Sequence, residues 1–200
     1  MFKKALLIVL MGSVAIAQAE VLPYISLSGG LNMLEDIDFD YPPALGGGGG
    51  SAEFDTGFVI SGAFGLAFES IPVRTEIEIS WQKNELDKIK FDGFGSISDD
   101  EDQKTSTVMW NGYFDFKSDS ALTPYILAGI GAADVDDDID TLFAYQVGAG
   151  LGYALDENII IDLKYKYFMT EDFDDDDGIY TVDFDGLAVH QVQMGIRYQF

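Results

Sequence analysis

The chain has 200 residues, of which 35 are Asp or Glu and 11 are Lys or Arg, so its net charge is −24. So acidic a surface repels phosphate backbones, which excludes nucleic-acid binding. Hydrophobic residues make up 48% of the chain and aromatic residues 14%, too much for intrinsic disorder. There is no cysteine, hence no disulfide framework, thiolate metal site or Cys-linked lipid, and we expect no cofactor.

The first 19 residues have the pattern of a secretory signal peptide. Lys3 and Lys4 form a positive n-region, residues 5–14 an apolar core, and residues 17–19 (Ala-Gln-Ala) a small-x-small cleavage site. The alternative, a membrane-anchoring helix, needs a longer apolar stretch. We therefore expect a mature domain of residues 20–200, whose net charge falls from −24 to −26 because two lysines are removed.

Beyond this segment, apolar residues alternate with polar ones, which is typical of β-strands with two different faces. Residues 73–82 read Val-Arg-Thr-Glu-Ile-Glu-Ile-Ser-Trp-Gln, and residues 159–167 read Ile-Ile-Ile-Asp-Leu-Lys-Tyr-Lys-Tyr. No apolar run reaches the roughly 18 residues that a membrane-spanning helix requires. A soluble β-sandwich would also alternate, but its charged faces seldom mix both signs so regularly.

Eight segments of about the length of a tilted membrane strand can be marked. They are residues 21–33, 57–68, 73–82, 105–116, 124–133, 142–155, 159–168 and 187–200. Their connections are long (34–56), short (69–72), long (83–104), short (117–123), intermediate (134–141), short (156–158) and long (169–186). This order suits a bacterial barrel, with long loops outside and tight turns inside, and a sandwich has no reason for it. The sequence predicts an all-β, transmembrane, antiparallel up-and-down β-barrel of eight strands.

The charges on the predicted inward faces balance. They are Glu69, Glu76, Glu78, Asp115 and Asp162 against Arg74, Lys117, Lys164, Lys166 and Arg197. Charges enclosed in a narrow barrel are costly unless they are paired. We therefore predict a structural polar network in the lumen made of Arg74, Glu76, Glu78, Asp115, Asp162, Lys164, Lys166 and Arg197. The acidic excess is left to the loops, above all residues 99–102, 136–140 and 172–177.

The outward faces carry aromatic residues, which favour the two membrane interfaces. Two girdles are predicted from Trp81, Trp110, Phe116, Tyr153, Tyr165, Tyr167, Tyr198 and Phe200. Residues 125–132 give the weakest strand because both of their faces are apolar or glycine. There we expect Ile126, Ala128 and Ile130 to face lipid.

Three stretches carry a resemblance to a known family. The last strand, His190-Gln-Val-Gln-Met-Gly-Ile-Arg-Tyr-Gln-Phe200, resembles the C-terminal signal of outer-membrane barrels. Residues 123–131 and 145–167 are similar to the small opacity-type and "porin family" outer-membrane proteins, a group of eight-stranded barrels and surface antigens. The resemblance implies an outer-membrane location, contact with lipid and lipopolysaccharide, and recognition of Tyr198 and Phe200 by the barrel-assembly machinery. It carries over no ligand-binding residues.

Candidate chemical sites are few. His190 is predicted to lie on the outward face near the outer rim, but Val192 occupies the place of the serine nucleophile in barrel enzymes that trim lipid A. The acidic loops offer oxygen ligands for divalent cations, although no EF-hand frame fits them, and a solvated loop is the simpler interpretation. Residues 46–50, all glycine, indicate a flexible loop tip. Gly148, Gly150 and Gly152 indicate inward positions where side chains must be small.

These observations predict a non-enzymatic barrel with a structural or surface-interaction role. Its long loops, which mix acids with aromatic residues, would bind a surface protein partner or divalent cations. The loop aromatics are Phe39, Tyr41, Phe54, Phe91, Phe94, Phe173, Tyr180 and Phe184. Two alternatives remain open: a narrow channel or binding barrel for a small molecule, and a lipid-modifying hydrolase.

Overall fold

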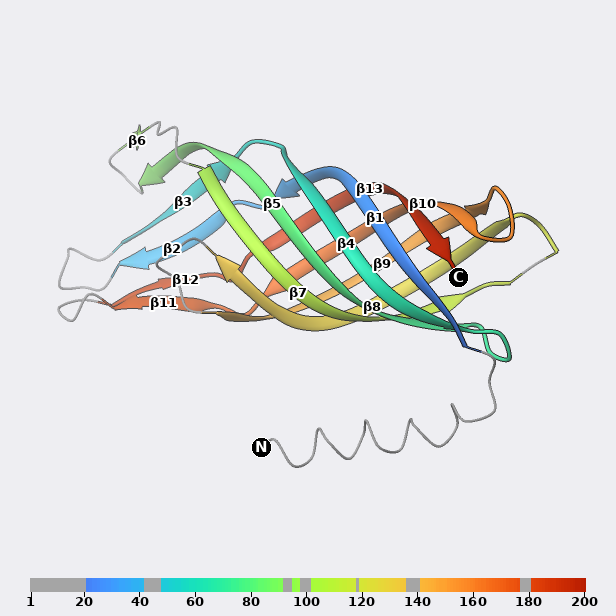
Figure 1. The fold of residues 1–200 in the computed structure, drawn as a ribbon. Coiled ribbons are helices and arrows are strands. Elements are labelled where there is room, and N and C mark those ends of the chain that lie inside the picture. Colours follow the sequence, from blue (N-terminus) through green and yellow to red (C-terminus); the bar gives the residue numbers. More distant parts are fainter. Residues whose placement is uncertain are drawn as a thin grey trace, which may run out of the picture.

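In the computed structural model, eight strands close into a barrel (Figure 1). The structure describes residues 21–41, 48–91, 95–97, 102–117, 119–135, 141–176 and 181–200. The barrel strands are β1 (Val21–Leu34), β4 (Gly57–Phe68), β5 (Val73–Phe91), β7 (Asp102–Asp115), β8 (Leu122–Val135), β9 (Leu142–Ala154), β10 (Ile159–Thr170) and β13 (Ala188–Gln199). Their order around the wall is β5-β4-β1-β13-β10-β9-β8-β7, and the β5–β7 pairing closes it. Every neighbouring pair is antiparallel, so the predicted fold class is confirmed.

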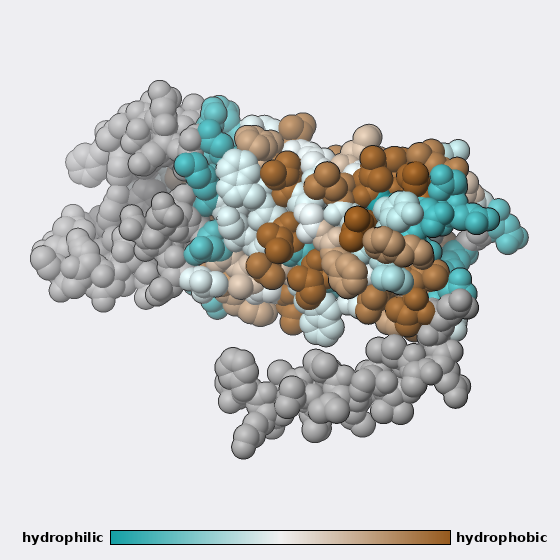
Figure 2. Space-filling model, in the orientation of Figure 1, coloured by the Kyte–Doolittle hydropathy of each residue, from teal (hydrophilic) through white to brown (hydrophobic). Residues whose placement is uncertain are grey.

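The alternation in the sequence becomes an apolar exterior and a polar interior. On β5, Ile77 and Ile79 are 49% and 62% exposed, whereas Glu76 and Glu78 are 4% and 1% exposed. A soluble protein would place these residues the other way round. Figure 2 shows the result on one face, an apolar belt between hydrophilic ends. In the part of the chain that the structure describes, no helix is long and apolar enough to cross a membrane.

The weakest predicted strand, residues 124–133, lies within β8. Ile126 and Ile130 are half exposed on its outer side, while Tyr125 and Leu127 are buried in the interior. The expected orientation of this strand is therefore confirmed.

The two ends of the barrel differ. The connections β4–β5, β7–β8 and β9–β10 are short and share one end, here called the turn end (Figure 1). The opposite end, the loop end, carries a second sheet. Its extra strands are β2 (Ile37–Tyr41), β3 (Gly48–Phe54), β6 (Gly95–Ile97), β11 (Phe173–Asp176) and β12 (Thr181–Phe184). They continue the wall beyond the barrel in the order β11-β12-β2-β3-β5, and β6 also pairs with β5.

The interpretation of residues 34–56, 83–104 and 169–186 as loops was therefore wrong. Ile37-Asp38-Phe39-Asp40-Tyr41 itself alternates with period two, and this short signal was missed. The glycine run was also misread, because Gly48–Gly50 belong to β3 and pair with β2. Glycine keeps its backbone donor and acceptor, so neighbouring strands can hold it in a ladder. Residues 42–47 lie outside the described part of the chain.

This loop-end sheet comprises β2, β3, β6, β11, β12 and the outer part of β5. The register between its strands places residues of the same type next to each other. One row across five strands reads Phe173, Phe184, Phe39, Gly50 and Phe91. The next row contains Asp174, Asp183 and Asp40.

Glycines inside the barrel make room for tyrosines of adjacent strands. Tyr24 on β1 is the register partner of Gly65, where an added Cβ would come within 2.2 Å of the tyrosine Cζ atom. Tyr125 on β8 pairs in the same way with Gly150, where the corresponding distance is 2.5 Å. This confirms that the glycines of β9 mark positions where inward side chains must be small.

Trp110 is an exception to the predicted aromatic girdles. Its register partners are Ile77 and Ile130, so it lies within the apolar belt rather than at an interface. Its indole N–H donates to the Thr75 hydroxyl at 2.7 Å. A polar hydrogen surrounded by hydrocarbon needs such a partner, which explains a threonine on the outward face of β5.

Candidate functional site

Two buried ion pairs join neighbouring strands on the inner side of the barrel wall near the turn end. Arg74 on β5 contacts Asp115 on β7, with Nε 2.8 Å from Oδ2. Arg197 on β13 contacts Asp162 on β10, with Nε 3.0 Å from Oδ2. The Arg74 guanidinium also lies over the Tyr113 ring, 4.3 Å from its centroid. Pairing, bidentate hydrogen bonds and ring contacts together compensate for the loss of water around buried arginines.

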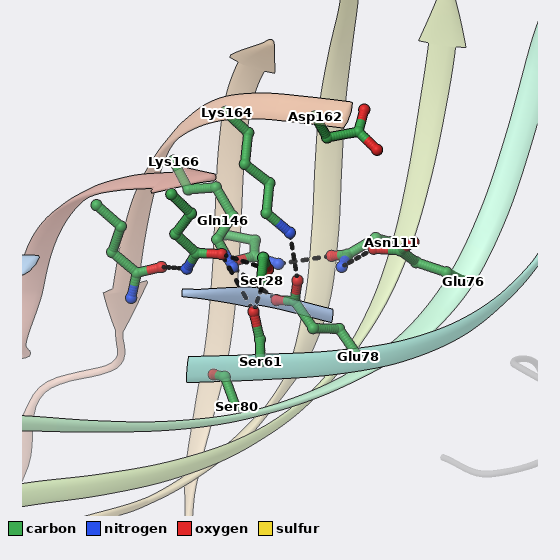
Figure 3. Close-up of polar contacts among 12 residues, drawn as sticks. Ser28, Ser61, Glu76, Glu78, Ser80, Asn111, Gln146, Asp162, Lys164 and Lys166 are labelled. Atoms are coloured by element: carbon green, nitrogen blue, oxygen red, sulfur yellow. Dashed lines mark hydrogen bonds and ion pairs between the residues drawn. The ribbon is translucent and has the colours of Figure 1, made fainter. Parts of the chain in front are cut away.

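A second group of charges lies deeper and converges on a single carboxylate. Lys164 and Lys166 of β10 reach toward Glu78 of β5, with Nζ–O distances of 3.1 and 2.6 Å (Figure 3). All three side chains are buried. The single negative charge of Glu78 therefore compensates partly for the two positive charges of Lys164 and Lys166, which come from the opposite side of the barrel.

Glu76 is held by neutral groups. It accepts hydrogen bonds from the Tyr24 hydroxyl at 2.9 Å, from the Tyr113 hydroxyl and from the Asn111 amide at 3.5 Å. With Glu76 included, the eight residues expected in the lumen carry four positive and four negative charges, and the structure places all eight in the interior. Enclosed charge is thus balanced, as electrostatics requires in a low-dielectric space.

Towards the loop end the network becomes uncharged. The amide of Gln193 donates to Gln191 at 2.9 Å, and that of Gln191 donates to Gln82 at 2.7 Å. The Ser28 hydroxyl donates to the Gln193 carbonyl at 3.0 Å. This layer links β1, β5 and β13 and fills the lumen with hydrogen-bonded side chains, which the charge count alone did not reveal.

An apolar cap closes the loop end of the lumen. Its buried members are Leu34, Ile37, Met109, Ala133, Leu142, Ala144, Phe168, Leu187 and Val189, and Phe54 packs against them. Ile37 and Phe54 belong to the loop-end sheet, and Leu187 follows it in the chain. The expectation that Phe54 is an exposed loop aromatic was wrong, because its ring packs against this cap. Sequence reasoning missed the cap because its members come from both strands and supposed loops.

Two internal spaces are lined by described residues. A cavity of about 20 Å³ lies between Glu76, Lys164 and the two arginines. At the turn end a wider vestibule of about 360 Å³ opens below Arg74 and Arg197. Glu69 and Lys117 line its mouth and are exposed, with Lys117 Nζ 3.2 Å from the Glu69 carbonyl. Their assignment to the closed lumen is therefore corrected, since solvent reaches both.

His190 lies on the outer wall near the loop end. Its Nδ1 atom is 2.6 Å from the Tyr165 hydroxyl, and its Nε2 atom is 2.7 Å from the Glu35 carboxylate. Tyr167 packs against the imidazole at a centroid distance of 4.7 Å. Both ring nitrogens are thus engaged by a phenol and a carboxylate, and Val192 occupies an exposed outward position.

The C-terminal aromatics also lie on the exterior. Phe200 is 60% exposed, and its ring meets that of Tyr198 edge-on at 5.2 Å. The Phe200 amide donates to the Pro23 carbonyl at 3.0 Å, which joins the last residue to the first barrel strand.

Among the residues whose side chains are described, no group of three His, Cys, Asp or Glu could hold a metal ion. The acidic runs 99–102 and 136–140, and the loop aromatics Phe94 and Tyr180, lie largely or wholly outside the described residues. The cation hypothesis for the loops therefore stays a prediction.

A closed eight-stranded antiparallel barrel with an apolar outer belt and an ion-paired interior defines a transmembrane β-barrel of the bacterial outer membrane. The chain matches the outer membrane protein beta-barrel domain over residues 5–200 and belongs to that family. Its location is therefore the outer membrane of a Gram-negative cell. Barrels of this kind have short turns on the periplasmic side and long connections outside the cell, which assigns the turn end to the periplasm and the loop end to the cell exterior.

Individual relatives agree with this assignment. The outer membrane protein PagN of Salmonella typhimurium is 34% identical over 118 residues, which is 48% of this chain and 49% of PagN. The match thus spans about half the length of that relative. Among solved structures, OprG from Pseudomonas aeruginosa superposes with a TM-score of 0.60 at 16% identity, covering 92% of this chain and 98% of OprG. Neisserial surface protein A gives 0.54 at 17% identity, covering 89% and 97%. These structures are similar in fold.

Proposed function

We propose that this barrel is a non-enzymatic scaffold that holds its extracellular loop-end sheet in place as an interaction surface. The observation that carries the proposal is the continuity between the two parts. β5 runs through the membrane and on into the loop-end sheet, while Ile37 and Leu187 bind that sheet to the capped lumen. Rigid support of exposed residues is what a binding surface needs.

The interior supports a scaffold better than a passage. An ion must cross the Arg74 and Arg197 layer, the Glu78 layer and the apolar cap, and the cavity between the charged layers measures about 20 Å³. A narrow channel would require several paired charges to separate together. The vestibule is open to the periplasm, but it ends at the two arginines.

The outer wall offers little support for the hydrolase alternative. A hydrolytic site needs a nucleophile held by a base, and the groups that hold His190 are Tyr165 and Glu35. Neither of them is a serine, and Val192 stands at the place of the expected nucleophile. We interpret the cluster of Glu35, Tyr165 and His190 as a structural contact that joins the end of β1 to β10 and β13.

The loop-end sheet suits a protein partner on the surface of another cell. Its register places Phe173, Phe184 and Phe39 in one row across the strands and Asp174, Asp183 and Asp40 in the next row. Aromatic residues are enriched where proteins meet, and charged rows add selectivity. Divalent cations bound by the acidic strands form a second possibility within the same proposal.

Trimmed loops test this proposal. One variant joins Ile37 to Ala52 through an Asn-Gly turn, and another joins Asp172 to Asp185 in the same way. Both keep Ile37, Phe54 and Leu187 and hence the cap. We expect both to fold, as judged by heat-modifiable migration, but to lose adherence to cultured cells and any calcium-dependent stabilisation. A control with two substitutions in the periplasmic turn at 155–158 should keep these activities. Trimmed barrels that adhere like the full chain would refute the interaction role.

A further inference from the structure

Two lysines lie next to each other on the outer wall at the extracellular end of the barrel. Lys83 on β5 is the register partner of Lys104 on β7. Both occupy outward positions, because they continue the alternation of Ile79 on β5 and Val108 on β7. Lys104 is exposed, and the Lys83 side chain is 25% exposed.

This position is unusual in so acidic a chain. The other basic side chains that the structure describes lie in the lumen or, for Lys117, at a periplasmic turn. Lys88 and Lys90 follow Lys83 on the same strand. Among the described barrel residues, the basic side chains at the extracellular membrane boundary are therefore those on β5 and β7. Elsewhere along this boundary the charged residues are acidic, namely Glu35, Asp134 and Glu171.

The lysines lie where the apolar belt ends. Phe58, the β4 register partner of Lys83, meets Trp81 edge-on with a centroid distance of 5.3 Å. Such an aromatic pair marks the interface between hydrocarbon and headgroups. A lysine one outward position beyond it can keep its stem along the belt and place its ammonium group among the headgroups.

Two acidic residues stand one step further from the membrane. Glu85 lies 3.9 Å from Lys83, measured from Oε1 to Nζ, and is the register partner of Asp102. Along β5 and β7, moving away from the membrane, the apolar belt comes first, then Lys83 and Lys104, and then Glu85 and Asp102. An anionic group in the bilayer surface therefore meets the lysines first, and the exposed Glu85 carboxylate lies on the water side.

We propose that Lys83 and Lys104 bind a phosphate group of an outer-leaflet glycolipid. Two lysines that are register partners on neighbouring strands supply the donors and the charge that a phosphate requires, and Phe58 and Trp81 lie where they can cover the acyl chains of the glycolipid. The site fixes the height and rotation of the barrel in the outer leaflet. It uses residues separate from the loop-end sheet, so it stands whether or not that sheet binds a partner.

Titration of the folded full-length mature protein in detergent with bisphosphorylated lipid A, followed by native mass spectrometry, tests the proposal. A basic residue near an anionic membrane surface contributes about 1 kcal/mol, which corresponds to about fivefold in affinity. We therefore expect K83Q/K104Q to bind about 25-fold more weakly. The matched control K117Q, at the periplasmic turn, should bind like the unmodified protein. The charge-conserving K83R/K104R should bind within about threefold of the unmodified protein, and heat-modifiable migration verifies that each variant is folded.

Three results would overturn the proposal. Equal binding of lipid A without phosphates would show that acyl or sugar contacts dominate. Loss of wild-type binding in EDTA would show a divalent bridge through Glu85 and Asp102 instead of the lysines. An unchanged affinity of folded K83Q/K104Q would exclude the lysines directly.

Discussion

Lys166 and Glu78 form an ion pair across the barrel, with Nζ 2.6 Å from Oε1 and both side chains 1% exposed. Lys164 contacts the same carboxylate, so Glu78 is the acceptor on which the central charges depend. The pair joins β10 to β5, which are not neighbours in the barrel wall. The contact therefore fixes the cross-section of the barrel as well as its charge.

We expect Glu78→Gln to destabilise the folded barrel by about 3–5 kcal/mol, because two buried ammonium groups lose their counter-charge. Denaturant unfolding in lipid vesicles measures this free energy. Glu157→Gln, in an exposed periplasmic turn, is the control and should stay within about 0.5 kcal/mol of the unmodified protein. Adding Lys166→Met to Glu78→Gln should recover part of the loss. A Glu78→Gln barrel as stable as the control would mean that water solvates the lysines.

Glycine-to-alanine substitutions test the fit between the inward tyrosines and the glycines of the adjacent strands. Gly65→Ala and Gly150→Ala place a methyl group against the rings of Tyr24 and Tyr125, and overpacking of this kind costs about 1–3 kcal/mol. Gly62→Ala on the outer side of β4 is the matched control, since its Cβ would meet only the Ser26 carbonyl, at 3.9 Å. Unfolding midpoints of the three variants should separate the inner from the outer glycines. Equal midpoints would refute the packing argument.

Deletion of Phe200 tests the C-terminal assembly signal, which the resemblance to barrel termini implies. We expect the deletion to leave less heat-modifiable protein in the outer-membrane fraction. In the unmodified protein from the same fraction, N-terminal sequencing should find Glu20 as the first residue. Phe116→Ala removes another exposed aromatic residue at the periplasmic end and should leave the yield nearly unchanged. A normal yield after deletion of Phe200 would mean that assembly reads other features of β13.

The layered lumen predicts that purified protein forms no large stable pore in planar bilayers. Ion pairs and the apolar cap occupy the described lumen, and an eight-stranded barrel is only wide enough for its own side chains to fill. Single-channel recording measures this, with a wide porin as the positive control. A steady conductance comparable to that porin would contradict the filled interior.

Strand positions and orientation followed from the sequence because a membrane barrel applies one rule to every strand. One face of each strand contacts lipid and the other faces the lumen. Polarity therefore alternates at every residue from Val73 to Gln82, and the polarity of each residue indicates the side on which it lies. The ion pairs of Arg74, Lys164 and Arg197 could be expected for the same reason, since the enclosed charges had to balance. Glu69 and Lys117 were misplaced because strand ends obey the alternation but lie in solvent.

The tertiary structure alone decided features that depend on residues distant in the chain. The apolar cap joins Leu34, Phe168 and Leu187 with Ile37 and Phe54 of segments interpreted as loops, and no local period connects them. The row Phe173, Phe184, Phe39 arises from the register between three hairpin strands. Lys83 and Lys104 meet because β5 pairs with β7 at that position. A sequence pattern specifies which face a residue occupies, whereas pairing between strands determines its neighbours on that face, because register is a property of two strands together.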